Sequence, residues 1–225
     1  MNGDGSPGQL ENRLQAGLAE LGLTLTDDQQ RQLLDYLALL AQWNRVYNLT
    51  ALRDPAQMLT HHLLDSLAVI APLRRHLHAT GTLSQPVRLL DVGSGGGLPG
   101  VVMAICQPEI AVTCVDSVAK KAAFIQQAAG ALRLPNLTGR HARVETLAEP
   151  FDLITSRAFA SLADFTTASR GALAEGGVWL AMKGKRPDVE IAALPLSVEV
   201  FHVEQLTVPG LEAERCLVWM RMIER

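Results

Sequence analysis

Aromatic residues are scarce in this sequence and make up only 4% of its 225 positions. So few aromatic side chains argue against a broad base-stacking platform of the kind that some RNA-binding sheets present. An excess of charge is also missing, because 20 Lys and Arg stand against 23 Asp and Glu and leave a net charge of −3. Non-specific binding to nucleic acid depends on many phosphate contacts, so this balance argues against a protein that coats nucleic acid. It leaves open the recognition of one structured RNA through a local basic patch.

Long apolar runs and paired cysteines are missing as well. The longest apolar stretches, such as 98–106, are much shorter than the roughly 20 residues that a bilayer-spanning helix needs. The sequence opens without the basic segment and apolar core of a secretory signal. Its three cysteines, Cys106, Cys114 and Cys216, lie within apolar runs, as buried thiols in a reducing compartment do. We therefore expect a cytoplasmic protein that does not associate with membranes.

Three segments differ in composition and periodicity. Residues 1–8 are rich in Gly, Ser, Pro and Asp, and we expect them to form a disordered tail. Residues 9–85 carry leucines at helical spacing, with a capping box at Thr26 and a second helix start at Asp54-Pro55. This pattern predicts a small helical bundle at the N-terminal end of the chain.

Residues 86–225 alternate short apolar runs with helical patterns, which is typical of a parallel sheet with right-handed crossovers. The expected strands are 87–92, 111–115, 137–141, 151–155 and 178–182. The expected helices are 99–106, 117–132, 162–173 and 187–193. Two final extended runs, 198–208 and 216–223, should add an antiparallel hairpin at the edge. The pattern predicts an α/β nucleotide-binding domain with a seven-stranded, mostly parallel sheet.

The strongest local signal is the glycine-rich loop that follows the first expected strand. The strand ends at Asp91, glycines follow at positions 93, 95, 96, 97 and 100, and Pro99 begins a helix. Glycine permits turns with positive φ and lets a ligand approach the backbone, and the free N–H groups of the helix would face that ligand. The next strand ends at Asp116, whose carboxylate can accept hydrogen bonds from both hydroxyls of a ribose. These features predict a binding site for a cofactor that contains a nucleoside.

Two classes of cofactor compete for this loop. The spacing Gly95-x-Gly97-x-x-Gly100 satisfies the dinucleotide fingerprint, which would indicate a nicotinamide-dependent oxidoreductase. Asp91, however, is unfavourable beside a pyrophosphate, because like charges repel, and suits a cationic ligand. S-adenosylmethionine has a sulfonium and an ammonium group and no phosphate. The acid therefore favours S-adenosylmethionine and a methyltransferase.

The residues after the later strands narrow the choice of methyl acceptor. The fourth strand is followed neither by the Pro-Cys nucleophile that attacks pyrimidine rings nor by an Asn-Pro-Pro-Tyr type motif for exocyclic amino groups. Instead Arg157 and Lys183 follow the fourth and fifth strands, at the edge of the sheet where ligands bind. These cations, together with Lys185 and Arg186, suit an anionic acceptor such as RNA, although a strand-end salt bridge or a solvated turn would also explain them. We favour a functional role for Arg157 and leave the role of Lys183 open.

A metal site is not expected. His61, His62 and Asp65 share a helix at spacings that could suit a metal pair, but the sequence offers no third, distant set of ligands. Packing or capping is the better explanation for them.

Five motifs, in this order, resemble the bacterial small-subunit ribosomal RNA guanine methyltransferase family, once called glucose-inhibited division protein B. They are Asn48-Leu-Thr-Ala-Leu-Arg53, His61-His-Leu-Leu-Asp-Ser-Leu67, Leu90-Asp-Val-Gly-Ser-Gly-Gly-Gly-Leu-Pro-Gly100, Ser156-Arg-Ala-Phe-Ala-Ser161 and Met182-Lys-Gly184. The resemblance covers about residues 10–220 and implies a Rossmann-like class I methyltransferase fold. It also implies transfer of a methyl group from S-adenosylmethionine to ring nitrogen 7 of a guanine in 16S ribosomal RNA. The expected partner is 16S RNA or the small ribosomal subunit, and we expect a monomer.

The same resemblance implies roles for individual residues. The cofactor-binding residues would be Gly93, Gly95, Leu98, Asp116, Val144, Glu145 and Arg157. Asp116 would hold the ribose, Val144 and Glu145 would lie beside the adenine, and Gly93 and Leu98 would line the methionine side. Arg157 would lie near the transferred methyl group and the RNA as a positioning residue, with no covalent nucleophile. A small-molecule methyltransferase of the same fold, with the N-terminal helices as a substrate lid, remains an alternative.

Overall fold

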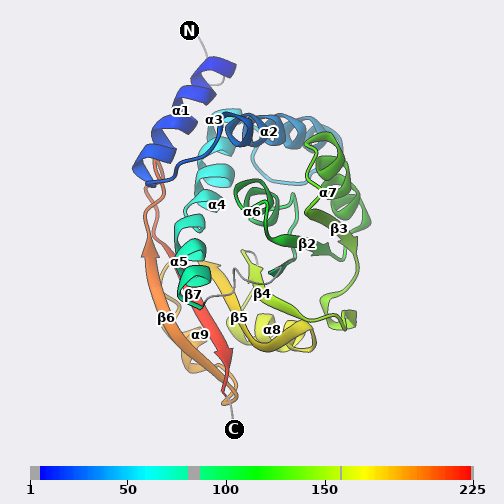
Figure 1. The fold of residues 1–225 in the computed structure, drawn as a ribbon, viewed down its shortest axis with the longest axis vertical. Coiled ribbons are helices and arrows are strands. Elements are labelled where there is room, and N and C mark those ends of the chain that lie inside the picture. The colour runs from blue at the N-terminus through cyan, green and yellow to red at the C-terminus, as the bar shows by residue number, and fades with distance from the viewer. Residues whose placement is uncertain (1–5, 81–86, 158, 224–225) are drawn as a thin grey trace.

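A central β-sheet organises the computed structural model, which describes residues 6–80, 87–157 and 159–223 (Figure 1). The sheet has seven strands in the order β3-β2-β1-β4-β5-β7-β6. Their bounds are β1 Arg88–Val92, β2 Ala111–Asp116, β3 Leu137–His141, β4 Phe151–Ser156, β5 Leu173–Lys183, β6 Val198–Leu206 and β7 Arg215–Met222. The first five strands are parallel, and β7 runs antiparallel to both β5 and β6. The predicted α/β fold and the closing hairpin are therefore confirmed.

Helices cover both faces of the sheet (Figure 1). In chain order they are α1 Pro7–Glu20, α2 Asp27–Tyr47, α3 Pro55–Met58, the π-helical segment η1 Leu59–Leu64, α4 Asp65–Leu67, α5 Ile70–Thr80, α6 Gly100–Cys106, α7 Ala119–Ala131, the 3-10 turn η3 Val144–Thr146, α8 Leu162–Ser169, the 3-10 turn η4 Arg170–Ala172 and α9 Asp188–Ala192. Helices α5, α6 and α7 pack on one face, and α8 and α9 lie on the other (Figure 1). A separate hydrophobic cluster fills each face.

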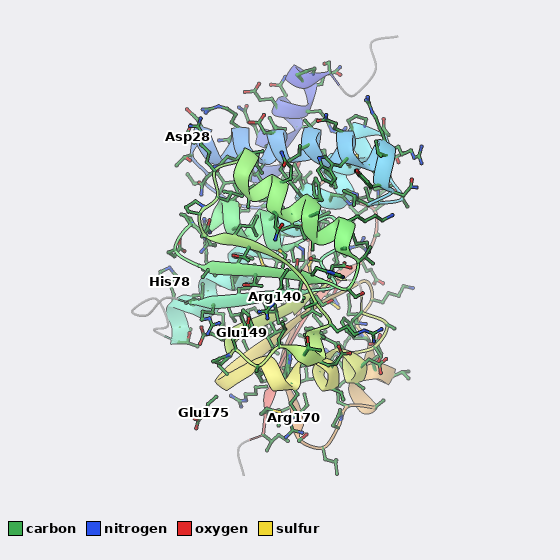
Figure 2. All side chains as sticks on the ribbon, turned by 90° about the vertical axis from the view of Figure 1, so that its right-hand side faces the viewer. Asp28, His78, Arg140, Glu149, Arg170 and Glu175 are labelled. Carbon is green, nitrogen blue, oxygen red and sulfur yellow. The ribbon has the colours of Figure 1, made fainter. Side chains whose placement is uncertain are left out.

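The N-terminal helices form an outer layer over one face of the sheet and do not make a separate bundle. Helix α2 packs against α6 and α7, and one hydrophobic cluster includes Leu14 of α1, Leu40 of α2 and Leu89 of β1. Figure 2 places Asp28, near the start of α2, at the opposite end of the molecule from Arg170 and Glu175. Leucines at helical spacing predicted these helices, but they could not reveal that the leucines complete the core of the sheet domain.

Helix α1 begins at Pro7, inside the segment 1–8 that we expected to be a disordered tail, while residues 1–5 lie outside the described residues. The three cysteines are free and buried. Within the described ranges, no helix combines the length and the apolar character that crossing a bilayer would require.

Two regions differ most from the predicted elements. The helix expected over 162–173 ends at Ser169, and β5 begins at Leu173, five residues before the strand expected at 178–182. Gly176, with φ of 71°, lies where the register between β4 and β5 shifts, so the glycines mark a bulge within a strand and not a loop. The helix that starts at Pro55 also changes to π-helical hydrogen bonding over Leu59–Leu64, which widens the turn that carries His61 and His62.

Candidate functional site

The segments that follow β1, β2, β3 and β4 meet at one edge of the sheet and surround a hollow of about 250 Å³, which we call the glycine-loop hollow. Its lining includes Gly93, Asp116, Ser117, Val144, Glu145 and Phe159. Parallel strands bring their carboxyl ends to the same edge, and the loops after them therefore converge although they are far apart in sequence. Four of the predicted cofactor residues, Gly93, Asp116, Val144 and Glu145, lie together in this hollow.

The glycine loop presents bare backbone to this hollow at Gly93. This residue is exposed and has φ of 66°, and no heavy atom lies within 4 Å of the position that a Cβ would take. A ligand can therefore approach the backbone more closely here than a side chain would allow. Gly95 lies beside the hollow, and its N–H donates to Oδ2 of Asp116, which lines the hollow. Leu98 is buried in the hydrophobic cluster and is not part of the lining. Gly95 and Leu98, which were expected to bind the cofactor together with Gly93, therefore do not line the glycine-loop hollow.

Asp116 is fixed at the wall of the glycine-loop hollow by its own hydrogen bonds. Its Oδ2 accepts from the N–H of Gly95 at 3.0 Å, and its Oδ1 accepts from the N–H of Val118 at 2.9 Å. The ammonium group of Lys121 lies 3.6 Å from Oδ2. A carboxylate offers about four lone-pair positions, so these contacts leave room for hydrogen bonds from ligand hydroxyls.

Asp91 does not face this hollow, and the expectation that it meets a cationic ligand there is wrong. The residue is fully buried beneath the glycine loop, where its Oδ2 accepts a hydrogen bond of 2.8 Å from the N–H of Gly100. Its Oδ1 has no hydrogen-bond partner among the described residues. Burial raises the pKa of this carboxyl to about 7, mainly because the charged form loses its hydration.

The start of α6 is likewise not free to bind a ligand, contrary to the prediction that its N–H groups face one. The N–H of Gly100 is held by Asp91, and the N–H of Val101 donates to the carbonyl of Gly97 at 2.8 Å. The helix therefore supports the loop from beneath.

Arg157 lies in a second hollow of about 360 Å³, which we call the arginine hollow. Its lining includes His61, His62, Asp65, Arg157, Lys183 and Arg215. The Nη1 of Arg157 donates to Oδ2 of Asp65 at 3.3 Å and to the carbonyl of His61 at 3.2 Å. The structure thus places Arg157 beside the cofactor candidates but not in the hollow that they share.

The two hollows are joined by the loop after β4. Phe159 lines the glycine-loop hollow, and its carbonyl accepts a hydrogen bond of 3.4 Å from Nζ of Lys183, which lines the arginine hollow. Lys183 also forms an ion pair of 2.8 Å with Glu190. The side chain of Lys183 therefore serves partly as a structural link between the wall of the arginine hollow and the wall of the glycine-loop hollow.

Nε2 of His62 and both carboxylate oxygens of Asp65 contact protein groups. Nε2 of His62 lies 2.7 Å from Oγ1 of Thr50, and burial lowers the pKa of this histidine to about 4. Both carboxylate oxygens of Asp65 form ion pairs with arginines. In the part of the chain that the structure describes, no three His, Cys, Asp or Glu side chains gather as a metal site would require.

Arg215 and Phe159 are site residues that sequence reasoning missed. Arg215 begins the last strand, and the antiparallel pairing of Lys183 with Cys216 brings this start to the carboxyl edge of β5. The expected hairpin could have predicted this position of Arg215, because an antiparallel strand begins at the edge of the sheet where its parallel neighbours end. Sequence reasoning assigned Asp65 to packing or capping, since no local pattern connects it to arginines 92 and 150 residues away.

Comparisons with known proteins agree on one family. Residues 29–218 match the family model described as "GidB: rRNA small subunit methyltransferase G". A ribosomal RNA small subunit methyltransferase G from Acidovorax ebreus (strain TPSY) is 68% identical over 217 residues, which cover 95% of this chain and 96% of the relative. Its counterpart from Polaromonas sp. (strain JS666 / ATCC BAA-500) is 69% identical over 211 residues, or 94% of this chain and 93% of the relative.

Among solved structures, the N-methyltransferase NodS from Bradyrhizobium japonicum, in complex with S-adenosyl-L-homocysteine, shares the fold. Its TM-score is 0.52 at 16% identity, over 77% of this chain and 94% of NodS.

Proposed function

The chain belongs to the GidB family, rRNA small subunit methyltransferase G, and from this premise we propose that it transfers a methyl group from S-adenosylmethionine to ring nitrogen 7 of one guanine in 16S ribosomal RNA. The observation that carries this proposal is the glycine-loop hollow, which gathers Gly93, Asp116, Val144 and Glu145 at the ligand-binding edge of a class I methyltransferase fold.

The residues of this hollow fit the proposed cofactor. The bare backbone at Gly93 leaves space that a Cβ would fill, and a ligand can pack directly against it. Asp116 would accept hydrogen bonds from the ribose hydroxyls with lone pairs that Gly95 and Val118 leave free. Val144 and Glu145 would lie beside the adenine. When bound, S-adenosylmethionine supplies an electrophilic methyl group.

Nitrogen 7 of guanine carries a lone pair and no proton, so its methylation needs no general base. Nη1 of Arg157 donates to the carboxylate of Asp65 and to the carbonyl of His61. Arg157 would hold the RNA at the arginine hollow, next to the loop that carries Phe159. Catalysis would then come mainly from alignment, for which proximity and orientation provide roughly 7–11 kcal/mol.

The alternatives find less support in the geometry. A mobile N-terminal lid over a small-molecule site does not suit α2, because Tyr36 of this helix is fully buried and its hydroxyl donates to the carbonyl of Gly96 in the glycine loop. A dinucleotide pyrophosphate would need free N–H groups at the start of α6, and Asp91 and Gly97 already occupy them.

The purified protein should transfer labelled methyl groups from S-adenosylmethionine to 16S RNA, either as naked RNA or within small subunits. The control reaction contains the same cofactor and a mixture of small metabolites in place of RNA. Absence of label from both forms of RNA, or strong turnover with the metabolites alone, would contradict the proposal. Calorimetry with a nicotinamide dinucleotide should give no binding heat.

A further inference from the structure

A buried carboxylate at the floor of the arginine hollow joins two arginines from distant parts of the chain. Asp65, whose side chain is only 4% exposed, lies 2.8 Å from Nε of Arg215 through Oδ1 and 3.3 Å from Nη1 of Arg157 through Oδ2. Arg157 follows β4, Arg215 begins β7, and Asp65 belongs to α4. One side chain from the N-terminal layer therefore fixes two guanidinium groups from the sheet.

The two guanidinium groups retain donors after these contacts. Each arginine carries five N–H donors. Arg215 uses Nε on Asp65 and Nη1 on the carbonyl of Glu214, and Arg157 uses Nη1 on Asp65 and His61. Among the described residues, Nη2 of neither arginine has a recorded hydrogen bond, and each side chain is 25% exposed.

The charges around the arginine hollow do not balance. Lys183 is paired with Glu190, so its charge is compensated. The two guanidinium groups share the single carboxylate of Asp65, which leaves one positive charge without a partner among the lining residues. Nδ1 of His62, which also lines the hollow, is buried and has no hydrogen-bond partner among the described residues. A structural ion pair alone would not need this excess of donors and charge.

From these contacts we propose that Asp65 positions Arg157 and Arg215 as a two-guanidinium site for a phosphate of the acceptor RNA, close to the methylated base. Guanidinium groups match phosphate oxygens in a fork geometry, which a lysine ammonium cannot reproduce. The link between Lys183 and Phe159 places this phosphate site beside the glycine-loop hollow. The inference rests on the proposed function and adds to it a residue, Arg215, that contacts the substrate.

The test compares two variants of one strand. Arg215→Gln removes the proposed phosphate contact, and Arg221→Gln removes an arginine at the other end of β7, where it pairs with Glu199 at 2.9 Å. Binding of 16S RNA is measured over a series of salt concentrations, together with calorimetric binding of S-adenosylmethionine. Arg215→Gln should weaken RNA binding roughly tenfold and lower the salt slope by about 1, since one phosphate contact is lost. Arg221→Gln should change neither quantity.

Two more variants separate positioning from charge. Arg215→Lys keeps the charge and loses the fork, so the salt slope should persist while RNA affinity falls to an intermediate value. Asp65→Asn makes the hollow more positive, yet it should weaken RNA binding, because both arginines lose the carboxylate that orients them. A purely electrostatic role would instead raise the affinity of Asp65→Asn for RNA.

Each failure has a distinct meaning. If the unaltered protein methylates RNA but Arg215→Gln binds RNA with the same affinity and salt slope, the phosphate site is wrong and the proposed function stands. If Arg215→Gln loses S-adenosylmethionine affinity as much as RNA affinity, the guanidinium groups hold the cofactor carboxylate, and the inference is overturned. If the unaltered protein neither binds nor methylates RNA, the proposed function itself fails.

Discussion

Asp91 and Asp116 end neighbouring strands, but burial gives the two carboxyl groups different environments. Asp116 remains at the wall of the glycine-loop hollow, where its hydrogen bonds orient it. Asp91 lies wholly inside the protein and holds the first N–H of α6. The sequence placed both acids at strand ends, where either could meet a ligand. The packing of α6 over the sheet buries Asp91, whereas Asp116 stays at the hollow where a ligand can reach it.

The raised pKa of Asp91 makes the stability of the protein depend on pH. Between its ordinary value of 3.8 and about 7, the folded state keeps a proton that the unfolded state has lost. The contribution of Asp91 to stability therefore falls as pH rises through this window. Asp91→Asn cannot lose a proton, so its stability relative to the unaltered protein should increase from pH 4 to pH 8, by up to about 4 kcal/mol.

Denaturant unfolding without cofactor, at intervals of pH, measures this difference. Asp28→Asn is the control, because Asp28 is exposed on α2 and forms a surface ion pair with Arg31, so its replacement should change stability by less than about 1 kcal/mol at every pH. A difference for Asp91→Asn that also stays flat would show that the buried carboxyl keeps an ordinary pKa.

Gly93 offers a test of the glycine-loop hollow in which backbone strain can be controlled. Gly93 has φ of 66° and Gly176 has φ of 71°, and no heavy atom lies within 4 Å of a Cβ built on either one. Replacement by alanine should cost about 1 kcal/mol of stability at each position, because an L residue is strained at positive φ. Only Gly93→Ala should also weaken S-adenosylmethionine binding, since only its Cβ would enter the proposed cofactor site. Equal cofactor affinity in Gly93→Ala and Gly176→Ala would show that Gly93 does not belong to the cofactor site.

At the scale of elements, α2 packs against the glycine loop and supports it. The hydroxyl of Tyr36 donates to the carbonyl of Gly96, and Cδ1 of Leu40 lies 2.9 Å from the position that a Cβ on Gly96 would take. The N-terminal layer therefore fixes the shape of the loop, in addition to burying apolar surface. Helical periodicity predicted α2, but a contact between residues 60 positions apart could not be read from it.

Tyr36→Phe should show whether this support reaches the cofactor. The change leaves the buried carbonyl of Gly96 without its donor, which should cost about 1–3 kcal/mol of stability. It should also weaken S-adenosylmethionine binding several-fold, because the loop loses an orienting contact. Tyr47→Phe, at the exposed end of the same helix, is the matched control and should alter neither quantity. Loss of stability with unchanged cofactor affinity would limit α2 to a packing role.

Most elements could be predicted because each leaves a local pattern in the sequence. Alternating apolar runs located the strands of the parallel sheet, and the parallel arrangement then placed Gly93 and Asp116 at one edge, whereas Val144 and Glu145 were expected there from the family resemblance. The early start of β5 was missed because a bulge at Gly176 has the same glycine signal as a loop. The arginine hollow was missed as a unit because it depends on pairing between α4, β4 and β7, which no local pattern records.

For the whole molecule, the net charge of −3 favours selective binding of RNA over general affinity for nucleic acid. Asp116 is buried at the wall of the glycine-loop hollow, and the raised pKa of Asp91 reduces its negative charge near neutral pH. Cations of the arginine hollow lie at the same edge of the sheet as the cofactor candidates. With few phosphate contacts, binding should depend on the shape of one RNA site, and its overall salt dependence should be modest.

In the proposed function, Arg157 would align the RNA with the cofactor. Arg157→Ala should lower methyl transfer roughly a hundredfold, because misplaced substrate loses alignment with the cofactor, while thermal stability changes far less. Arg75 of α5 forms an ion pair of 2.6 Å with Glu204 of β6, and the control variant Arg75→Ala should retain full activity. A proportional loss of stability and activity in Arg157→Ala would instead support a structural salt bridge.

The most direct test of the account is to identify the atom that receives the methyl group. Small-subunit RNA methylated by the purified protein would be treated to cleave the chain at 7-methylguanine, and the cleavage site would be mapped by primer extension. The account predicts cleavage at a single guanine of 16S RNA, with the label recovered as 7-methylguanosine and the signal strongly reduced for Arg157→Ala. Label in another nucleoside, or cleavage at many guanines, would contradict it.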